Sequence, residues 1–87
     1  MGDDVIIIAV GKDKPGLVAS VTSIIAELSG NIEEMDQVVL RNIFIMSLVV
    51  RFLNSEFSGK FEKLCEALAK EGERVGLRIH AYRLSDL

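Results

Sequence analysis

Two spacings of hydrophobic residues alternate along this chain, and the changes between them divide it into six elements. Runs rich in β-branched residues predict strands over about 4–11, 31–40, 43–52 and 77–84. Apolar residues repeat at helical spacing between these runs, over about 15–29 and 57–75. The apolar positions of the two predicted helices are Leu17, Val18, Val21, Ile24, Ile25 and Leu28, then Phe57, Phe61, Leu64, Cys65, Leu68 and Val75.

Glycine, proline and serine mark the expected ends of the helices. Pro15, the single proline, is predicted in the first turn of the first helix, where its fixed φ suits a helix start. Gly30 is predicted to stop that helix and Gly76 to end the second one. Ser55 or Ser58 is expected to cap the start of the second helix.

The order strand, helix, strand, strand, helix, strand predicts an α+β fold of the ferredoxin-like type, βαββαβ. Right-handed crossovers place both helices on one face of a four-stranded antiparallel sheet. Residues 31–40 mix polar and apolar side chains, which predicts a strand with one wet side at an edge of the sheet. Arg41 and Asn42 predict a tight hairpin, because Asn tolerates positive φ.

The central strands are apolar on both sides, although the predicted helices cover only one face. The first strand directs Val5, Ile7 and Ala9 to one side and Ile6, Ile8 and Val10 to the other, and residues 43–52 are apolar in the same way. A bare apolar face of several hundred Å² (order of magnitude) favours association. We therefore expect the protein to self-associate through the bare face, the edge strand, or both.

Length, charge and cysteine content exclude several classes of protein. The 87 residues suffice for one domain, residues 1–87, and the net charge of −3 argues against nucleic acid and anionic membranes as partners. No apolar run is long enough for a transmembrane helix, and the acidic start Met1–Asp4 is unlike a signal peptide, so a cytoplasmic location is expected. Neither a metal site nor a cofactor is expected, and the single Cys65 is predicted to be a buried, inert thiol.

Three other functions of this fold require residues that the chain lacks. An RNA-binding module needs aromatic side chains on the first strand as well as a basic surface. A metal carrier of this topology needs paired cysteines after the first strand. An acylphosphatase-like enzyme needs an arginine in the first loop, where this chain has Lys12 and Lys14. Cys65 and His80 are the candidates for a nucleophile and its base, but they lie on elements with no evident common pocket, so no catalytic residue is predicted.

The turn between the first strand and the first helix carries the candidate chemistry. Residues 11–18 read Gly-Lys-Asp-Lys-Pro-Gly-Leu-Val. Gly16 allows another group to approach the backbone at the start of the helix, where free N–H groups and the positive dipole end attract carboxylates. The alternative is a strand-to-helix turn that binds nothing.

This turn, followed by Gly30-Asn31-Ile32, resembles the motif of the ACT domain, an amino-acid-sensing regulatory module. The resemblance covers nearly the whole chain and is strongest for small stand-alone ACT proteins, which are similar to half of the glycine-cleavage-system repressor. It implies a small ligand, often an amino acid, held between subunits, with Asp13 and Asn31 on its polar groups. The ligand-binding residues that it implies are Lys12, Asp13, Lys14, Pro15, Gly16, Leu17, Asn31 and Ile32.

Ordinary structural roles remain open for the two polar residues of this set. Asp13 is as compatible with capping the helix as with binding a ligand, and Asn31 with turning the chain out of the first helix. The sequence therefore predicts a non-catalytic regulatory module, a homodimer or higher oligomer, that binds an amino acid or small carboxylate and acts on a partner protein. The alternative is an interaction module that has no small ligand and docks through its apolar sheet face.

Overall fold

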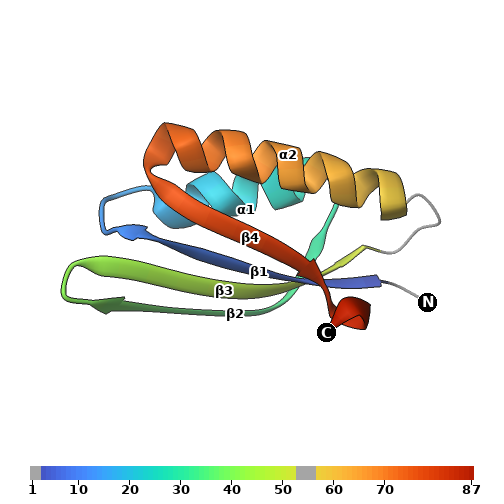
Figure 1. Cartoon of the computed structure of the whole chain (residues 1–87), viewed down its shortest axis with the longest axis horizontal. Helices are drawn as coiled ribbons and strands as arrows, with labels where there is room; N and C mark the ends of the chain where they lie inside the picture. The colour runs from blue at the N-terminus through green and yellow to red at the C-terminus, as the bar shows by residue number, and fades with distance from the viewer. Residues whose placement is uncertain (1–2, 53–56) are drawn as a thin grey trace.

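The computed structural model describes residues 3–52 and 57–87, and its elements follow the predicted order (Figure 1). Strand β1 spans Asp3–Lys12, helix α1 Leu17–Glu27, strand β2 Asn31–Leu40, strand β3 Ile43–Phe52, helix α2 Phe57–Val75 and strand β4 Leu77–Arg83. A short 3₁₀ turn, η1, follows at Leu84–Asp86. The predicted strand bounds are therefore confirmed to within one residue.

The four strands form one sheet in the order β2-β3-β1-β4, with every neighbouring pair antiparallel. Both helices pack on the same face of this sheet (Figure 1). This is the ferredoxin-like arrangement that the sequence predicts. Because β3 runs antiparallel to both β1 and β2, the strands β1 and β2 run in the same direction, so β2 starts at the end of the sheet where β1 starts.

The core lies between the helices and one side of the central strands. Every second residue of β3 from Phe44 to Phe52 is buried, as are three residues of β1. The buried residues of the core are Val5, Ile7, Ala9, Leu17, Val21, Ile25, Phe44, Met46, Leu48, Val50, Phe52, Leu64, Leu68, Val75 and Leu77. The predicted division of each central strand into two sides is thus confirmed, and the structure shows which side faces the helices. We call the other side of the sheet, which the helices do not cover, the open face.

Strand β2 is an edge strand, as predicted, but both of its sides are exposed to solvent, whereas the sequence predicts one exposed side. All ten of its residues are exposed, including apolar ones such as Met35, Val39 and Leu40. The physical reason is that β2 is the outermost strand on its side of the sheet, so the helices bury none of its residues. Apolar side chains therefore flank an unpaired strand edge, an arrangement that proteins ordinarily cover.

Helix α1 is two residues shorter at each end than predicted. Pro15 lies in a turn before the helix, which begins at Leu17. At the other end Ser29, rather than Gly30, adopts the left-handed conformation, with φ 61°. The N–H groups of Ser29 and Gly30 donate to the carbonyls of Ala26 and Ile25, which is a Schellman cap. Gly30 is small for a different reason, since a Cβ there would lie 2.7 Å from Val50 and 2.9 Å from Ile25.

The other predicted turns are confirmed where the structure describes them. Arg41 and Asn42 both have positive φ, at 49° and 67°, as a two-residue type I′ hairpin requires. Gly76, with φ 79°, ends α2. Of the two serines proposed as caps for α2, Ser55 and the side chain of Ser58 lie outside the described residues.

Candidate functional site

The loop from β1 to α1 is fixed to the β2–β3 hairpin. The backbone N–H of Asp13 donates to the carbonyl oxygen of Asn42 at 2.8 Å, just after β1 ends. Residues 12–16 are all exposed. The loop therefore stands at the end of the sheet where β2 ends and β3 begins (Figure 1).

Helix α1 starts without an acidic partner. Gly16 occupies the N-cap with φ 88° and makes no side-chain capping hydrogen bond, and the first turn contains no acidic residue. The N–H and hydroxyl groups of Ser20 both donate to the Gly16 carbonyl, at 3.0 and 3.1 Å. No hydrogen bond joins the Asp13 carboxylate to this turn within the described part of the chain. The positive end of the helix is thus open to an anion.

A shallow groove of about 410 Å³ lies between this loop and strand β2. We call it the loop groove. It combines a carboxylate, an ammonium group and an amide with an apolar floor, and its size falls within the range of small-ligand sites. Its lining is Asp13, Lys14, Gly16, Leu17, Val18, Ala19, Gln37, Val38, Val39 and Phe44. Grooves of similar volume occur elsewhere on the surface, and two of them also combine acidic with basic side chains. The loop groove differs from these in its amide group and its apolar floor.

The structure gathers part of the predicted site and separates the rest. Asp13, Lys14, Gly16 and Leu17 line the loop groove, whereas Lys12 and Pro15 adjoin it in the chain without lining it.

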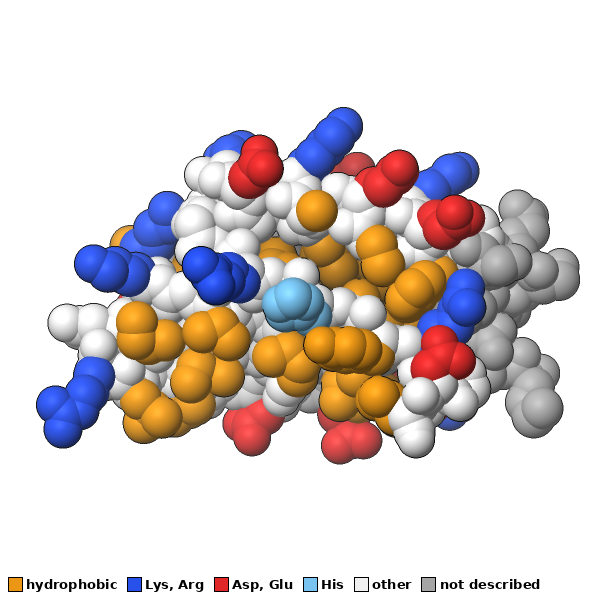
Figure 2. All heavy atoms as spheres, in the orientation of Figure 1, with side chains coloured by type: hydrophobic (Ala, Val, Ile, Leu, Met, Phe, Trp, Pro, Cys, Tyr) orange, Lys and Arg blue, Asp and Glu red, His pale blue; other side chains and the backbone are white. Residues whose placement is uncertain are grey.

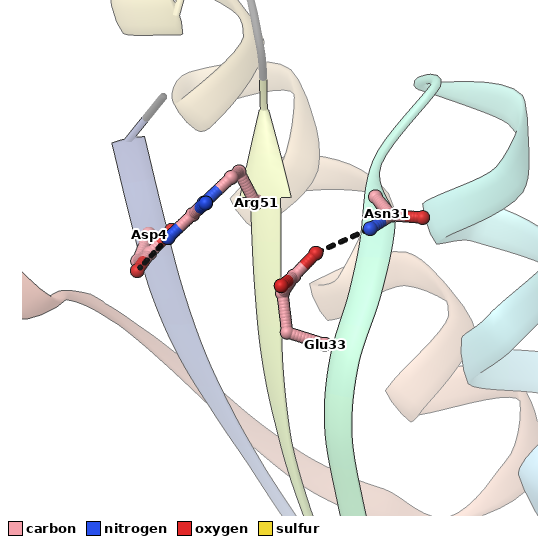
Figure 3. Close-up of polar contacts among 4 residues, drawn as sticks. All are labelled: Asp4, Asn31, Glu33 and Arg51. Atoms are coloured by element: carbon pink, nitrogen blue, oxygen red, sulfur yellow. Dashed lines mark hydrogen bonds and ion pairs between the residues drawn. The ribbon is translucent and has the colours of Figure 1, made fainter. Parts of the chain in front are cut away.

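Asn31 and Ile32 lie at the opposite end of the sheet from the loop. Asn31 pairs with Arg51, which in turn pairs with Asp4 near the start of β1. Eight residues of β1 separate that position from Lys12, a distance of roughly 26 Å. Figure 3 shows Asn31 beside this Arg51–Asp4 pair, with its amide donating to the Glu33 carboxylate. Within one chain, Asn31 and the loop cannot hold the same small ligand.

Sequence reasoning missed the contribution of β2 and β3 to the groove, namely Gln37, Val38, Val39 and Phe44. The predicted topology already contained the signal for them. Two strands joined by a right-handed crossover run parallel, so the end of β2, not its start, lies beside the loop that follows β1. Asn-Ile drew attention as a motif, but motif spacing carries no information about strand direction.

The other reactive groups do not meet. Cys65 is half-buried on α2, and this burial raises the pKa of its thiol, although the nearby Arg83 acts in the opposite direction. His80 is exposed on the open face of β4, where its ring stacks on Tyr82 with 6.4 Å between centroids. The sheet lies between Cys65 and His80. Among residues 3–52 and 57–87, no three His, Cys, Asp or Glu side chains gather as metal ligands, and no helix is long and apolar enough to cross a membrane.

Comparison with known proteins shows which families and structures this sequence and fold are similar to. The model of a family described as "ACT domain" matches residues 3–82. A UPF0237 protein of Lactococcus lactis is 41% identical over 75 residues, 86% of this chain and 82% of that protein. An ACT domain protein from Streptococcus pneumoniae superposes with a TM-score of 0.86 at 32% identity, covering 99% of this chain and 94% of that one.

A fourth comparison bears on the fold alone. A structure described as a "putative glycine cleavage system transcriptional repressor" superposes with a TM-score of 0.82 at 19% identity. The match covers 95% of this chain and 46% of the other, so the whole domain corresponds to about half of that protein.

Proposed function

Because this chain belongs to the ACT domain family, whose domains are regulatory modules that bind small ligands, we propose that it binds an amino acid or a similar small carboxylate in the loop groove, at an interface between two copies. The observation that carries the proposal is the meeting of opposite charges in this groove. Asp13 supplies a carboxylate, while Lys14 and the uncapped start of α1 supply positive potential. A zwitterion presents both complementary charges.

In this arrangement, each charged group of the ligand has an oppositely charged partner in the groove. The ligand ammonium is held by Asp13, and its carboxylate by the N–H groups at the start of α1 together with Lys14 and the neighbouring Lys12. The ligand side chain rests on Leu17, Val39 and Phe44, with the Gln37 amide at the rim. An apolar floor with a few polar groups is the usual composition of such sites.

The second copy accounts for Asn31 and Ile32. If β2 pairs antiparallel with β2 of another copy about Met35, residues 31 and 32 of the partner stand beside Val39 and Val38. The exposed, unpaired edge of β2 leaves room for this pairing. The proposal therefore includes a site shared between copies, in the cytoplasm, whose occupied state is read by a partner protein.

A ligand screen tests the chemistry. Thermal shift and calorimetry with each of the twenty amino acids and small carboxylates should give one or two ligands, since about a hundredfold excess over Kd adds roughly 2.7 kcal/mol of stability. Asp13→Ala should weaken the ligand at least tenfold. Asp86→Ala is the matched control, because Asp86 is exposed in η1 at the other end of the molecule (Figure 1). A flat screen, or equal loss in both variants, would refute the proposal.

Mixing two defective variants tests the sharing of the site. Asp13→Ala and Asn31→Ala should each bind weakly alone. After subunit exchange, random pairing gives mixed dimers with one intact site, so about a quarter of all sites should regain wild-type affinity. Unchanged affinity of Asn31→Ala would show that the loop groove works within one chain.

A further inference from the structure

The open face of the sheet is apolar over its two central strands, β1 and β3. Strands β1 and β3 place Ile6, Ile8 and Val10 beside Val49 and Ile45. The apolar area continues onto β2 and β4 through exposed Val38, Leu40 and Tyr82. Figure 2 shows hydrophobic side chains spread over this face around the histidine, with acidic side chains along the margin where Figure 1 draws β2.

Charges on the open face are ordered from one edge of the sheet to the other. Glu34 and Asp36 lie on β2, whereas Arg78 lies on β4, the opposite edge, next to the polar ring of His80. At the end of the sheet where β1 begins, the charges form a third feature. Arg51 on β3 donates to Asp4 on β1 at 2.8 Å (Figure 3), and this contact lowers the pKa of the Asp4 carboxyl.

We propose that the open face is a homodimer interface, with the twofold axis parallel to the strands and running between β3 and β1. This rotation lays β2 of one copy over β4 of the other and β3 over β1. Asp36 then stands over the partner's His80 and within reach of the partner's Arg78, while Arg51 stands over the partner's Asp4. The apolar centre closes as Val49 meets the partner's Ile6. An acidic strand thus meets a basic strand on each side of the apolar centre.

The other in-plane axis, across the strands, is excluded by the same charges. It would lay each strand over its own copy, so the acidic side chains of β2 would face those of the partner's β2, and Arg78 would lie over the partner's β4, which carries Arg78 as well. Charge complementarity therefore favours a second copy of this chain as the partner. It also favours the orientation in which the strands of the two copies run parallel.

The area of the open face sets the expected affinity of the face-to-face dimer. Four strands at about 4.8 Å spacing and about eight residues of length give roughly 500 Å² per copy. The total of about 1,000 Å² lies at the lower limit of specific interfaces. The face-to-face dimer is therefore expected to dissociate on dilution rather than to be permanent.

This contact is distinct from the pairing along β2 that the shared ligand site requires. Strand β2 carries Glu33, Glu34 and Asp36 and no basic residue, so pairing with itself brings like charges together. Salt should consequently strengthen the β2 pairing and weaken the face-to-face dimer. The face-to-face dimer needs no ligand, so its test does not depend on the proposed function.

Reversal of one charge and its rescue test the proposal. Sedimentation velocity of the full chain without ligand, at low salt and over a concentration series, should show a monomer–dimer equilibrium. Asp36→Arg should weaken the dimer about tenfold, Arg78→Asp should do the same, and the double variant should recover it. Asp36 and Arg78 lie three strand spacings apart in one chain, about 14 Å, so rescue can arise only between copies.

The remaining outcomes are equally decisive. A dimer that tightens in Asp36→Arg would show pairing along β2 and overturn the proposal. A monomer at all concentrations, or two single variants that the double variant does not rescue, would overturn it as well. Ile8→Lys, at the centre of the face, should abolish the dimer, whereas Met35→Lys, exposed on the helix side of β2, should keep it. Circular dichroism confirms that each variant is folded.

Discussion

Substitution of Gly72 by alanine has two opposing effects on stability, and the packing of α2 against β4 decides which is larger. In a helix interior, alanine is favoured over glycine by about 0.8–1 kcal/mol. A Cβ at Gly72 would, however, lie 2.5 Å from the carbonyl oxygen of Leu77. The two atoms must separate by at least about 0.5 Å to reach any observed contact.

Neither side of this contact can move freely. The Leu77 backbone is held in the sheet by its pairing with Gly11, and a single residue, Gly76, joins it to α2. On the helix side, Leu68 and Val75 are anchored in the core. Overpacking of this kind costs typically 1–3 kcal/mol. We therefore expect Gly72→Ala to lower the free energy of unfolding by about 1 kcal/mol, despite the better helix former.

Urea unfolding at one fixed protein concentration measures this free energy, because association makes stability concentration-dependent. A loss of 1 kcal/mol should also lower Tm by about 4–8 °C in a domain of this size. Gly59→Ala is the matched control on the same helix, since its Cβ would have no neighbour within 4 Å. It should stabilise the protein by up to about 1 kcal/mol. Equal stabilisation by both substitutions would refute the packing argument.

Four further predictions concern the loop, the open face and the thiol. Gly16→Val should abolish ligand binding and cost stability, since φ 88° is strained for a β-branched residue; calorimetry and urea unfolding would measure both, and retained affinity would remove the loop from the site. Arg51 lowers the pKa of Asp4, so the stabilisation from this pair should be full above the unfolded pKa near 3.8 and should disappear as the pH falls through the folded pKa. The free energies of unfolding of wild type and Asp4→Asn should therefore converge at low pH. Since burial raises the pKa of Cys65, its reaction with a disulfide reagent near pH 8 should be slower in the folded than in the urea-unfolded chain; equal rates would contradict the burial. If the ligand joins copies along β2 while the open face also pairs, the two twofold axes do not intersect, and the assembly cannot close. Light scattering should therefore detect assemblies that lengthen with protein concentration, and only when ligand is added.

Local pattern was sufficient for much of the fold. The apolar run of β3 and the Arg41–Asn42 turn could be placed from sequence, because side-chain alternation and positive φ are properties of neighbouring residues. The same alternation revealed that β1 and β3 are apolar on both sides, which is the basis of the open face. Even the end of α1 was nearly right, although the left-handed residue was Ser29 rather than Gly30, since packing against Val50 gave Gly30 a different role.

The composition of the candidate site depended on strand direction and order, which are properties of the whole chain. Sequence alone identified the loop with Asp13 and Gly16, but joined to it Asn31, which the parallel course of β1 and β2 places at the other end of the sheet. Only the tertiary structure brought Gln37 and Phe44 to the loop and set an acidic edge opposite a basic one. Local periodicity determines which side of a strand a residue occupies; which distant residues stand beside it is decided by how the strands are ordered, and no short stretch of sequence encodes that.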